Sequence, residues 1–347
     1  MAKKGRKVKV VSKLIIGIII GIACLLGGIG YKMLWAPNFI PSNTIYIYVD
    51  SVRDFDDLCA QVEKEGHCKD LFMFRLLAGI FDYPSKMLTG RYAINPGMNN
   101  LSLLNDLRRG HQKATSITFN SVRLKEDLAE SLDKQLMLST EDLLSLLNDS
   151  AYCSSLGFTT QTIAAIFIPN TYEVYWNISP ARLVERMLKE YNRFWTEERK
   201  AKAASQGLTP VEVEILASIV QEETADLSEY PVIAGLYLNR LRRGMLLQAD
   251  PTVKFAVGNF SLQRVLYKHL EIDSPYNTYK YAGLPPGLLR LATIQGIDAV
   301  LNATKHSYLY MCAKEDFSGK HNFARTLAEH SRNALRYQQA LNRRNIR

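Results

Sequence analysis

Several common catalytic motifs are missing from this sequence. The six histidines show no H-E-x-x-H or comparable ligand spacing, which argues against a zinc hydrolase. There is no G-x-S-x-G nucleophile elbow, no phosphate-binding P-loop and no G-x-G-x-x-G after a predicted strand. No cysteine pair has C-x-x-C spacing, and no internal repeat or low-complexity tract is present. Carboxylate chemistry is what these absences leave open.

Acidic residues are also missing from the start of the chain, where the first is Asp50. Six basic residues precede it within 1–13, and without them the net charge of +9 falls to +3 over more than three hundred residues. The remaining charge makes no obvious footprint for nucleic acid, so the basic cluster indicates a membrane partner. The chain of 347 residues is long enough for two modest domains.

An uncharged apolar run, "LIIGIIIGIACLLGGIGY", follows the basic segment directly. It predicts a transmembrane helix over 14–35, with 1–13 on the cytoplasmic side and the rest of the chain outside. The alternative is a cleaved signal peptide. The run is longer than a signal peptide's apolar region and no A-x-A site follows it, so an uncleaved anchor is favoured.

Past this anchor, the pattern predicts a small domain over 43–115. Strand-like "NTIYIYVD" is followed by two helical segments, a second strand "GRYAI" and a further helix, in the order β-α-α-β-α. Such a unit resembles a LysM-like wall-binding module. Two of the cysteines in it, Cys59 and Cys68, are close enough in sequence for a disulfide, and burial as small apolar residues is an equal alternative.

The segment from 118 onward begins with helices and contains one aromatic stretch, "IFIPNTYEVYW". Its Tyr172, Tyr175 and Trp176 are interpreted as core residues, with a sugar-stacking platform as the alternative. One charged helix is expected over 181–204.

Two adjacent glutamates end a well-marked helix. Thr209 and Glu212 form a capping box with a proline at the first helical position. At 100° per residue the apolar side chains form one stripe, and Glu223 falls in its middle. Glu222 lies about a quarter-turn outside the stripe and Gln221 points away. A carboxylate directed at apolar surroundings has its pKa raised, which suits a general acid. The alternative is that Glu223 pairs with a buried arginine, either Arg240 or Arg290.

Two loops follow the next helix, which starts at Pro231. They are "MLLQADPT" over 245–252 and "SPYNTYKYAGLPPG" over 274–287. Neither has the apolar periodicity of a core segment, and the second is dense in Tyr, Asn, Pro and Gly. Ordered loops of this composition are more often binding surfaces than connectors.

A family resemblance emerges from these motifs taken together. "LASIVQEETA", "LYLNRLRRGMLLQADPTV", "SPYNTY", "GLPPG" and "YLYMCAKEDFSGKHNFARTLAEH" occur in this order. The sequence closely resembles the endolytic murein transglycosylases, the MltG or YceG-like family, from about Phe167 to the C-terminus. The resemblance is looser through the LysM-like module and the anchor. It implies an α+β protein with a single N-terminal transmembrane helix, a small LysM-like βααβ domain and a mixed α/β catalytic domain over 118–347.

The resemblance also implies an activity and a site. The family cleaves peptidoglycan glycan strands between N-acetylmuramic acid and N-acetylglucosamine and leaves a 1,6-anhydro end. In the family pattern S-I-V-E-K-E-T the second Glu is catalytic, and it corresponds to Glu223, while Gln221 and Glu222 depart from the pattern. Asn170 stands where the family has Asp, and "GLPPGLLRLAT" departs from the family in its loop. No cofactor or metal is implied. The candidates for holding the sugars are Asn239, Gln248, Asp250, Tyr276 and Asn277.

A single acid–base glutamate is consistent with this chemistry. The muramic acid's own C6 hydroxyl attacks the anomeric carbon, so no second carboxylate has to activate water. The implied partners are glycan strands and cell-wall synthases, at the outer side of the cytoplasmic membrane. Two alternatives remain: a catalytically idle wall-binding scaffold, and a hydrolytic muramidase with Asp250 as second carboxylate.

Overall fold

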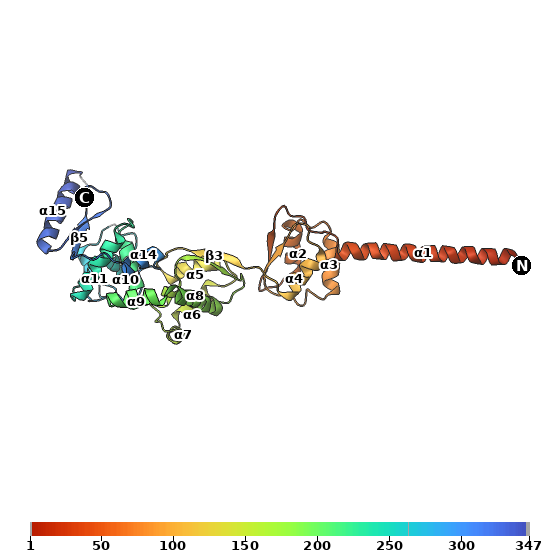
Figure 1. The fold of residues 1–347 in the computed structure, drawn as a ribbon, viewed down its shortest axis with the longest axis horizontal. Helices are drawn as coiled ribbons and strands as arrows, with labels where there is room; N and C mark the ends of the chain where they lie inside the picture. Colours follow the sequence, from red (N-terminus) through yellow and green to blue (C-terminus); the bar gives the residue numbers. More distant parts are fainter. Residues whose placement is uncertain (1, 263, 345–347) are drawn as a thin grey trace. The chain divides into compact units, whose positions relative to one another are not determined.

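The structure is a computed structural model that describes residues 2–262 and 264–344. Residue 1 of the predicted segment 1–13, and residues 263 and 345–347 of the predicted domain 118–347, lie outside the described residues. Helices and three two-stranded sheets make up a mixed α+β fold (Figure 1). The chain divides into two compact units, 1–116 with 173–178, and 117–172 with 179–347.

The first unit contains six elements. They are α1 (Ala2–Leu34), β1 (Ile45–Val49), α2 (Phe55–Lys64), α3 (Leu71–Ile80), β2 (Gly90–Ile94) and α4 (Asn100–Arg109). Strands β3 (Thr115–Phe119) and β4 (Asn170–Val174) pair with each other, and each includes a point where the chain passes between the units; the chain passes once more between Ile178 and Ser179.

The second unit is mainly helical and contains one hairpin. Its elements are α5 (Lys125–Asp133), α6 (Thr140–Asn148), α7 (Ser150–Ser155), the 3-10 helix η1 (Ile163–Ile166), α8 (Pro180–Phe194), α9 (Glu197–Gln206), α10 (Pro210–Glu223), α11 (Tyr230–Arg242), α12 (Asp250–Val257), α13 (Tyr267–Leu270), α14 (Ile294–Leu301), β5 (Tyr310–Ala313), β6 (His321–Ala324) and α15 (Leu327–Arg343).

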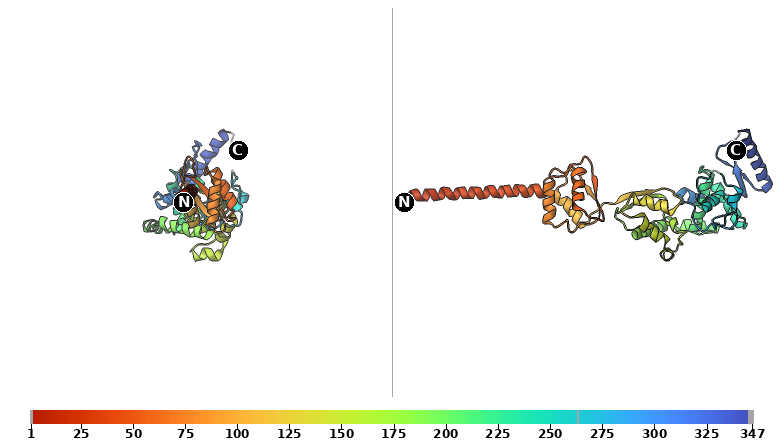
Figure 2. Two further views of the ribbon diagram at one scale, coloured as in Figure 1. Left: turned by 90° about the vertical axis from the view of Figure 1, so that its right-hand side faces the viewer. Right: turned by 180° about the vertical axis from the view of Figure 1, so that it is seen from behind.

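Helix α1 contains the predicted apolar span. Its window Lys13–Leu34 has a mean hydropathy of 2.4, and none of it is buried inside the structure. By length and composition this helix can cross a bilayer. It is drawn as one continuous helix (Figure 2). The prediction of one N-terminal apolar helix is therefore confirmed.

The small domain forms the predicted β-α-α-β-α order. β1 and β2 are antiparallel, with Ile47 opposite Tyr92, and both of these side chains are fully buried. Side chains cap the helices: Asp54, Asp70 and Asn99 each accept hydrogen bonds from backbone N–H groups of the first turn. The apolar faces of α2, α3 and α4 pack with the sheet into one core. This shared core makes the small domain over 43–115 compact although it is short.

Cys59 and Cys68, the two cysteines of the small domain over 43–115, are free thiols in the structure. Cys59 is fully buried in the core, and burial raises the pKa of its thiol to about 11. Cys68 is partly buried and accepts a hydrogen bond from the Asn38 amide.

One predicted helix is wrong. The expected helix over 181–204 is two helices, α8 and α9, because the backbone leaves the helical region at Trp195 with ψ 70°. Thr196 then caps the second helix by accepting a hydrogen bond from the N–H of Arg199. Trp195 is buried, and its indole Nε1 donates to Glu214 at 2.9 Å. The break between α8 and α9 therefore places Trp195 in the core, which the charge pattern of this segment does not predict.

The aromatic stretch divides between core and surface. Tyr172 is partly buried and stacks on Phe119 with ring centroids 5.5 Å apart. Trp176 lies edge-on against Tyr48 at 4.9 Å, whereas Tyr175 is exposed. The interpretation of all three as core is thus wrong for Tyr175.

Helix α10 is the centre of the second unit. It packs against α9, α11, α12 and α14, and α9, α11 and α14 surround it in Figure 1. Every side chain over 213–220 is buried, including that of Glu214. The predicted apolar stripe is buried, but burial extends around the helix to Glu214 and Ser218 as well, and only the helix ends, 210–212 and 221–223, are partly exposed.

Candidate active site

The end of α10 brings the two glutamates to the surface of the core. The helix starts as predicted: Thr209 and Glu212 form the capping box, and Pro210 occupies the first turn. It ends because Thr224 is extended, with φ −146° and ψ 149°, so the chain turns away after Glu223. Gln221 packs against α14 and accepts a hydrogen bond from the Thr293 N–H at 2.9 Å.

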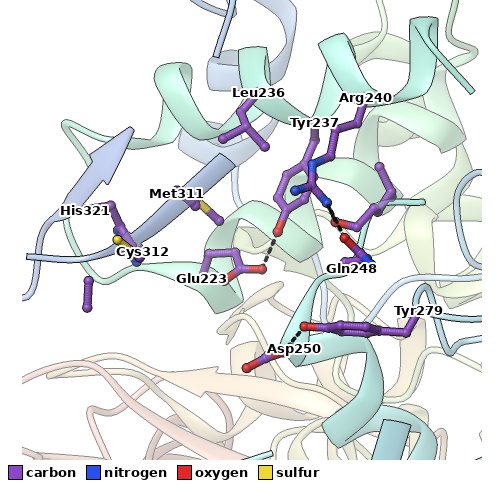
Figure 3. A pocket seen from close by; sticks show the side chains of 12 residues that line it. Glu223, Leu236, Tyr237, Arg240, Gln248, Asp250, Tyr279, Met311, Cys312 and His321 are labelled. Atoms are coloured by element: carbon purple, nitrogen blue, oxygen red, sulfur yellow. Dashed lines mark hydrogen bonds between the residues drawn. The ribbon is translucent and has the colours of Figure 1, made fainter. Parts of the chain in front are cut away.

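Glu223 has a phenol, and no cation, as its hydrogen-bond partner within the described residues. The hydroxyl of buried Tyr237, on α11, donates to its carboxylate (Figure 3). Burial, together with the nearby negative charge of Asp250, raises the pKa of Glu223 to about 7. The Tyr237 hydrogen bond and the charges of Lys254 and Arg240 oppose this rise without cancelling it. Glu223 can therefore hold a proton near neutral pH, as a general acid must.

Glu222, one residue earlier, is fully paired. Its carboxylate accepts from Arg123 at 3.1 and 2.9 Å and from Arg290 at 3.0 Å. The alternative that Glu223 pairs with Arg240 or Arg290 is therefore wrong. Arg290 belongs to Glu222, and Arg240 donates to the carbonyls of Leu246, Leu247 and Leu309 and to the side chain of Gln248.

A cavity of about 200 Å³ opens at Glu223. Two of the predicted sugar-binding residues, Gln248 and Asp250, line it beside Glu223 (Figure 3). Asp250 accepts a hydrogen bond of 2.6 Å from the Tyr279 hydroxyl, and Gln248 accepts one of 3.3 Å from Arg240. Asp250 is in the first turn of α12, so the segment 245–252 is only partly the loop that was expected.

A second and larger cavity, of about 790 Å³, lies against the same two carboxylates. Glu223 and Asp250 line both cavities, and Glu222, Lys254 and Arg264 join them in the larger one. Residues of α15 complete its lining. The carboxylate with the raised pKa therefore lines both cavities.

The other three predicted residues do not line either of these cavities. Asn239 uses its amide to hold the backbone carbonyls of His306 and Tyr308, at 2.8 and 3.1 Å. Asn277 is fully buried, and its amide donates to the carbonyls of Leu270 and Ile272.

Tyr276 is placed differently again. Its ring packs against Phe255 with centroids 4.7 Å apart, and it lines a separate cavity of about 330 Å³. Tyr276 therefore lies away from the Glu223 cavities, whereas the amides of Asn239 and Asn277 bind backbone carbonyls and stabilise the loops that frame the site.

Four polar residues of the 200 Å³ cavity were not predicted as site residues. They are Tyr237, Arg240, Tyr279 and His321. Tyr237 and Arg240 lie three residues apart on α11, so they share one face of the helix, and this spacing is the signal that could have found them. His321 starts β6, far along the chain, and its position depends on tertiary structure. In the described residues, 2–262 and 264–344, no group of His, Cys, Asp and Glu is arranged to hold a metal ion.

Glu223 is thus a protonatable carboxylate at the end of a core helix, and it lines two cavities. The chain belongs to the YceG-like family, whose model matches residues 47–336. The resemblance found in the sequence motifs is therefore confirmed.

Two curated proteins that are similar to this chain are both named endolytic murein transglycosylase. An endolytic murein transglycosylase of Bacillus subtilis (strain 168) is 30% identical over 264 residues, which cover 72% of each chain. That of Streptococcus pneumoniae serotype 2 (strain D39) is 26% identical over 306 residues, covering 80% of this chain. The match spans only 55%, about half, of the pneumococcal protein. A crystal structure of a YceG-like protein of Listeria monocytogenes, 24% identical, matches with a TM-score of 0.54 over 84% of this chain and 99% of that one, and so shares its fold.

Proposed function

We propose that this protein is a membrane-anchored endolytic murein transglycosylase. It would cut the glycan strands of peptidoglycan between N-acetylmuramic acid and N-acetylglucosamine, and end each cut strand in 1,6-anhydro-muramic acid. The names of the relatives support the substrate class and the lyase activity. The observation that carries the proposal is the protonatable Glu223 between two cavities.

In this proposal Glu223 transfers both protons of the reaction. As an acid it protonates the departing glycosidic oxygen while the bond from that oxygen to the anomeric carbon breaks. As a carboxylate it then takes the proton of the C6 hydroxyl, whose oxygen forms the new bond to the same carbon. No water enters, so one carboxyl group suffices, whereas hydrolysis generally needs two. Asp250 and Gln248 line the same cavity and are proposed to hold sugars there.

The two cavities support an internal cut. An enzyme that acts within a strand must accommodate sugars on both sides of the reacting bond, and Glu223 is accessible from both cavities. The larger cavity has Lys254 and Arg264 in its lining, where cations could contact the carboxylates of stem peptides. Termination of strand elongation would follow, with cell-wall synthases as partners.

The product of digestion tests this function. Purified full-length protein is incubated with uncrosslinked glycan strands, and the fragments are weighed by mass spectrometry. Internal fragments with 1,6-anhydro ends, one water lighter than hydrolytic fragments, are expected. Reducing ends without anhydro product would make the enzyme a muramidase, with Asp250 as the second carboxylate to test. Absence of any cut would favour a wall-binding scaffold.

We further propose the topology and the role of the small domain. The basic N-terminus and the apolar helix support an uncleaved anchor with the second unit outside the cytoplasmic membrane. A C-terminal reporter that is active only outside the cytoplasm should then be active.

The domain over 43–115 is proposed to be a LysM-like module that binds glycan weakly. A folded fragment from Thr118 onward should therefore still cut soluble strands.

A further inference from the structure

A histidine–carboxylate pair forms part of the cavity beside Glu223. His321, the first residue of β6, donates its backbone N–H to Oε1 of Glu229 at 2.8 Å. Its ring Nδ1 lies 2.9 Å from Oε2 of the same carboxylate, which also accepts from the hydroxyl of Thr224. Glu229 is almost completely buried, with 7% of its surface exposed, at the residue before α11. Three donors thus converge on one buried carboxylate.

The Glu229 carboxylate determines which ring nitrogen of His321 carries the proton. An ionised carboxylate only accepts hydrogen bonds, so the proton between the two groups is carried by Nδ1. In the neutral ring, Nε2 is then an acceptor. Nε2 has no hydrogen-bond partner among the described residues, and His321 lines the 200 Å³ cavity that Glu223 lines. In Figure 3 His321 and Tyr237 lie on either side of Glu223.

The β5–β6 hairpin supplies one wall of this cavity. Its other lining residues are Met311, Cys312 and Ala313, which have no strong hydrogen-bonding side chain. His321 is therefore the polar contact that this wall offers to a ligand. Sugars present many hydroxyl donors, and a cavity binds them through a few placed acceptors and donors.

A second interaction already attaches the β5–β6 hairpin to the turn between α10 and α11, so the His321–Glu229 pair is not needed for that attachment alone. Lys320 and Asp226 form an ion pair of 3.1 Å that joins the same hairpin to the same turn between α10 and α11. That pair is partly exposed and does not line the cavity. Burial of a carboxylate is costly unless its hydrogen bonds are satisfied, and the three donors to Glu229, two of them from His321, meet this condition. The His321–Glu229 pair has a further result, which is the orientation of the His321 ring.

We propose that His321 is a substrate-binding residue whose Nε2 accepts a hydrogen bond from a glycan hydroxyl in the Glu223 cavity, and that Glu229 is the residue that positions it. The identity of the ligand as a glycan rests on the proposed function. The inference adds an acceptor on the hairpin side of the site, opposite the Tyr237 side. Loss of one neutral hydrogen bond of this kind corresponds to roughly a three- to tenfold weaker complex.

The test measures binding separately from cutting. Full-length Glu223→Gln protein, which cannot transfer the proton, is titrated with uncrosslinked glycan oligosaccharides. Adding His321→Ala should weaken binding roughly three- to tenfold, and His321→Gln, which keeps a polar atom near Nε2, should restore part of it. In proteins with Glu223 intact, His321→Ala should raise KM by a similar factor, with kcat nearly unchanged.

Glu229→Gln tests the positioning role. The backbone N–H of His321 can only donate, so it pairs with the new amide oxygen and leaves the amide nitrogen facing Nδ1. The ring must then carry its proton on Nε2, which becomes a donor. A glycan hydroxyl can rotate to accept from this donor, so binding should weaken, but by less than in His321→Ala, while the protein stays folded. The matched control is Asp226→Asn, which removes the exposed link to Lys320 and should leave binding unchanged.

The outcomes separate this inference from the proposed function. If wild type yields anhydro ends and His321→Ala binds and cuts like wild type, the inference is overturned and the function stands. If wild type does not cut but glycan binding still depends on His321, the function fails and the inference stands. A hundredfold loss of kcat at unchanged KM would overturn the binding role in favour of proton transfer. Equal loss of binding in Asp226→Asn would reduce the pair to an attachment.

Discussion

Two neighbouring regions meet at the end of α10 and treat adjacent carboxylates in opposite ways. In the arginine cluster, Arg123, Glu222 and Arg290, the carboxylate has a guanidinium on each side. In the cavity next to it, Glu223 has a neutral phenol as its partner, and burial raises its pKa to about 7. Successive helical residues point about 100° apart, which is enough to direct one to the charged loops and the other to α11.

This difference separates structural from reactive charge. A carboxylate between two guanidinium groups holds them through charge-assisted hydrogen bonds, which is a structural task. A carboxylate in apolar surroundings with one phenol donor keeps both protonation states accessible near neutral pH. The cluster also joins α10 to the segments that carry Arg123 and Arg290, so it positions the helix end that presents Glu223. One site thus needs both glutamates for different reasons.

The largest expected effect is on catalysis by Glu223. Glu223→Gln keeps the shape of the side chain and an acceptor for Tyr237, but removes the proton that is transferred. The rate of anhydro-end formation should fall by roughly 10²–10⁴-fold, the usual contribution of general acid–base catalysis. Rates are measured by mass spectrometry of digested glycan strands, at matched protein concentrations.

Glu222→Gln is the control for this experiment. It changes the neighbouring residue by the same atoms and should cost far less activity, because the arginine cluster does not transfer protons. Equal losses in the two variants would mean that the helix end, and not the Glu223 proton, limits the reaction. Full activity of Glu223→Gln would remove Glu223 as the acid.

Glu223→Gln should also increase the free energy of unfolding above neutral pH. The pKa of Glu223 is about 7 in the folded protein and close to its ordinary value of 4.5 in the unfolded chain, so its ionisation costs folding free energy as pH rises from 4.5 to 7. Glu223→Gln removes this cost, on the order of 3 kcal/mol at pH 8. The gain should disappear below about pH 4.5, where both forms are neutral. Thermal melting of wild type and variant at pH 4 and pH 8 measures it, and a gain that is the same at both pH values would contradict the raised pKa.

Glu222→Gln should change stability in the opposite direction. It leaves two guanidinium groups with a weaker partner, and both are partly exposed, so water recovers part of the loss. A decrease of about 1–2 kcal/mol is expected, read as a lower melting temperature at every pH from 5 to 8. Glu197→Gln, in an exposed pair with Lys200, is the matched control and should change stability by less than about 0.5 kcal/mol. Stability unchanged in Glu222→Gln would mean that the cluster does not hold the helix end.

Much of this site follows from local sequence. The capping box at Thr209 and Glu212 sets the start of α10, and rotation from there predicts which glutamate turns inward. Local chemistry also indicates the strands and helices of the small domain, where Asp54, Asp70 and Asn99 mark helix starts.

The remainder depends on contacts between distant segments. Tyr237 reaches Glu223 only because α11 folds back along α10, and His321 is almost a hundred residues farther on. Asn239 and Asn277 have the side chains of sugar-binding residues, yet their amides satisfy loop carbonyls. An amide is equally suited to both tasks, so residue type alone cannot distinguish them.

The smallest expected effect is a shift of the pH profile in Tyr237→Phe. The Tyr237 hydroxyl lowers the pKa of Glu223 by donating to the ionised form, so its removal should raise that pKa further. Activity that needs protonated Glu223 is present below the pKa and lost as pH rises through it. The falling limb of kcat/KM should therefore move to higher pH, with less than about a tenfold change in rate at the optimum. Tyr279→Phe is the control, because that hydroxyl donates to Asp250, and it should leave the limb in place. A limb that moves to lower pH in Tyr237→Phe would mean that the phenol stabilises the protonated carboxyl, and that the contrast with the arginine cluster rests on burial alone.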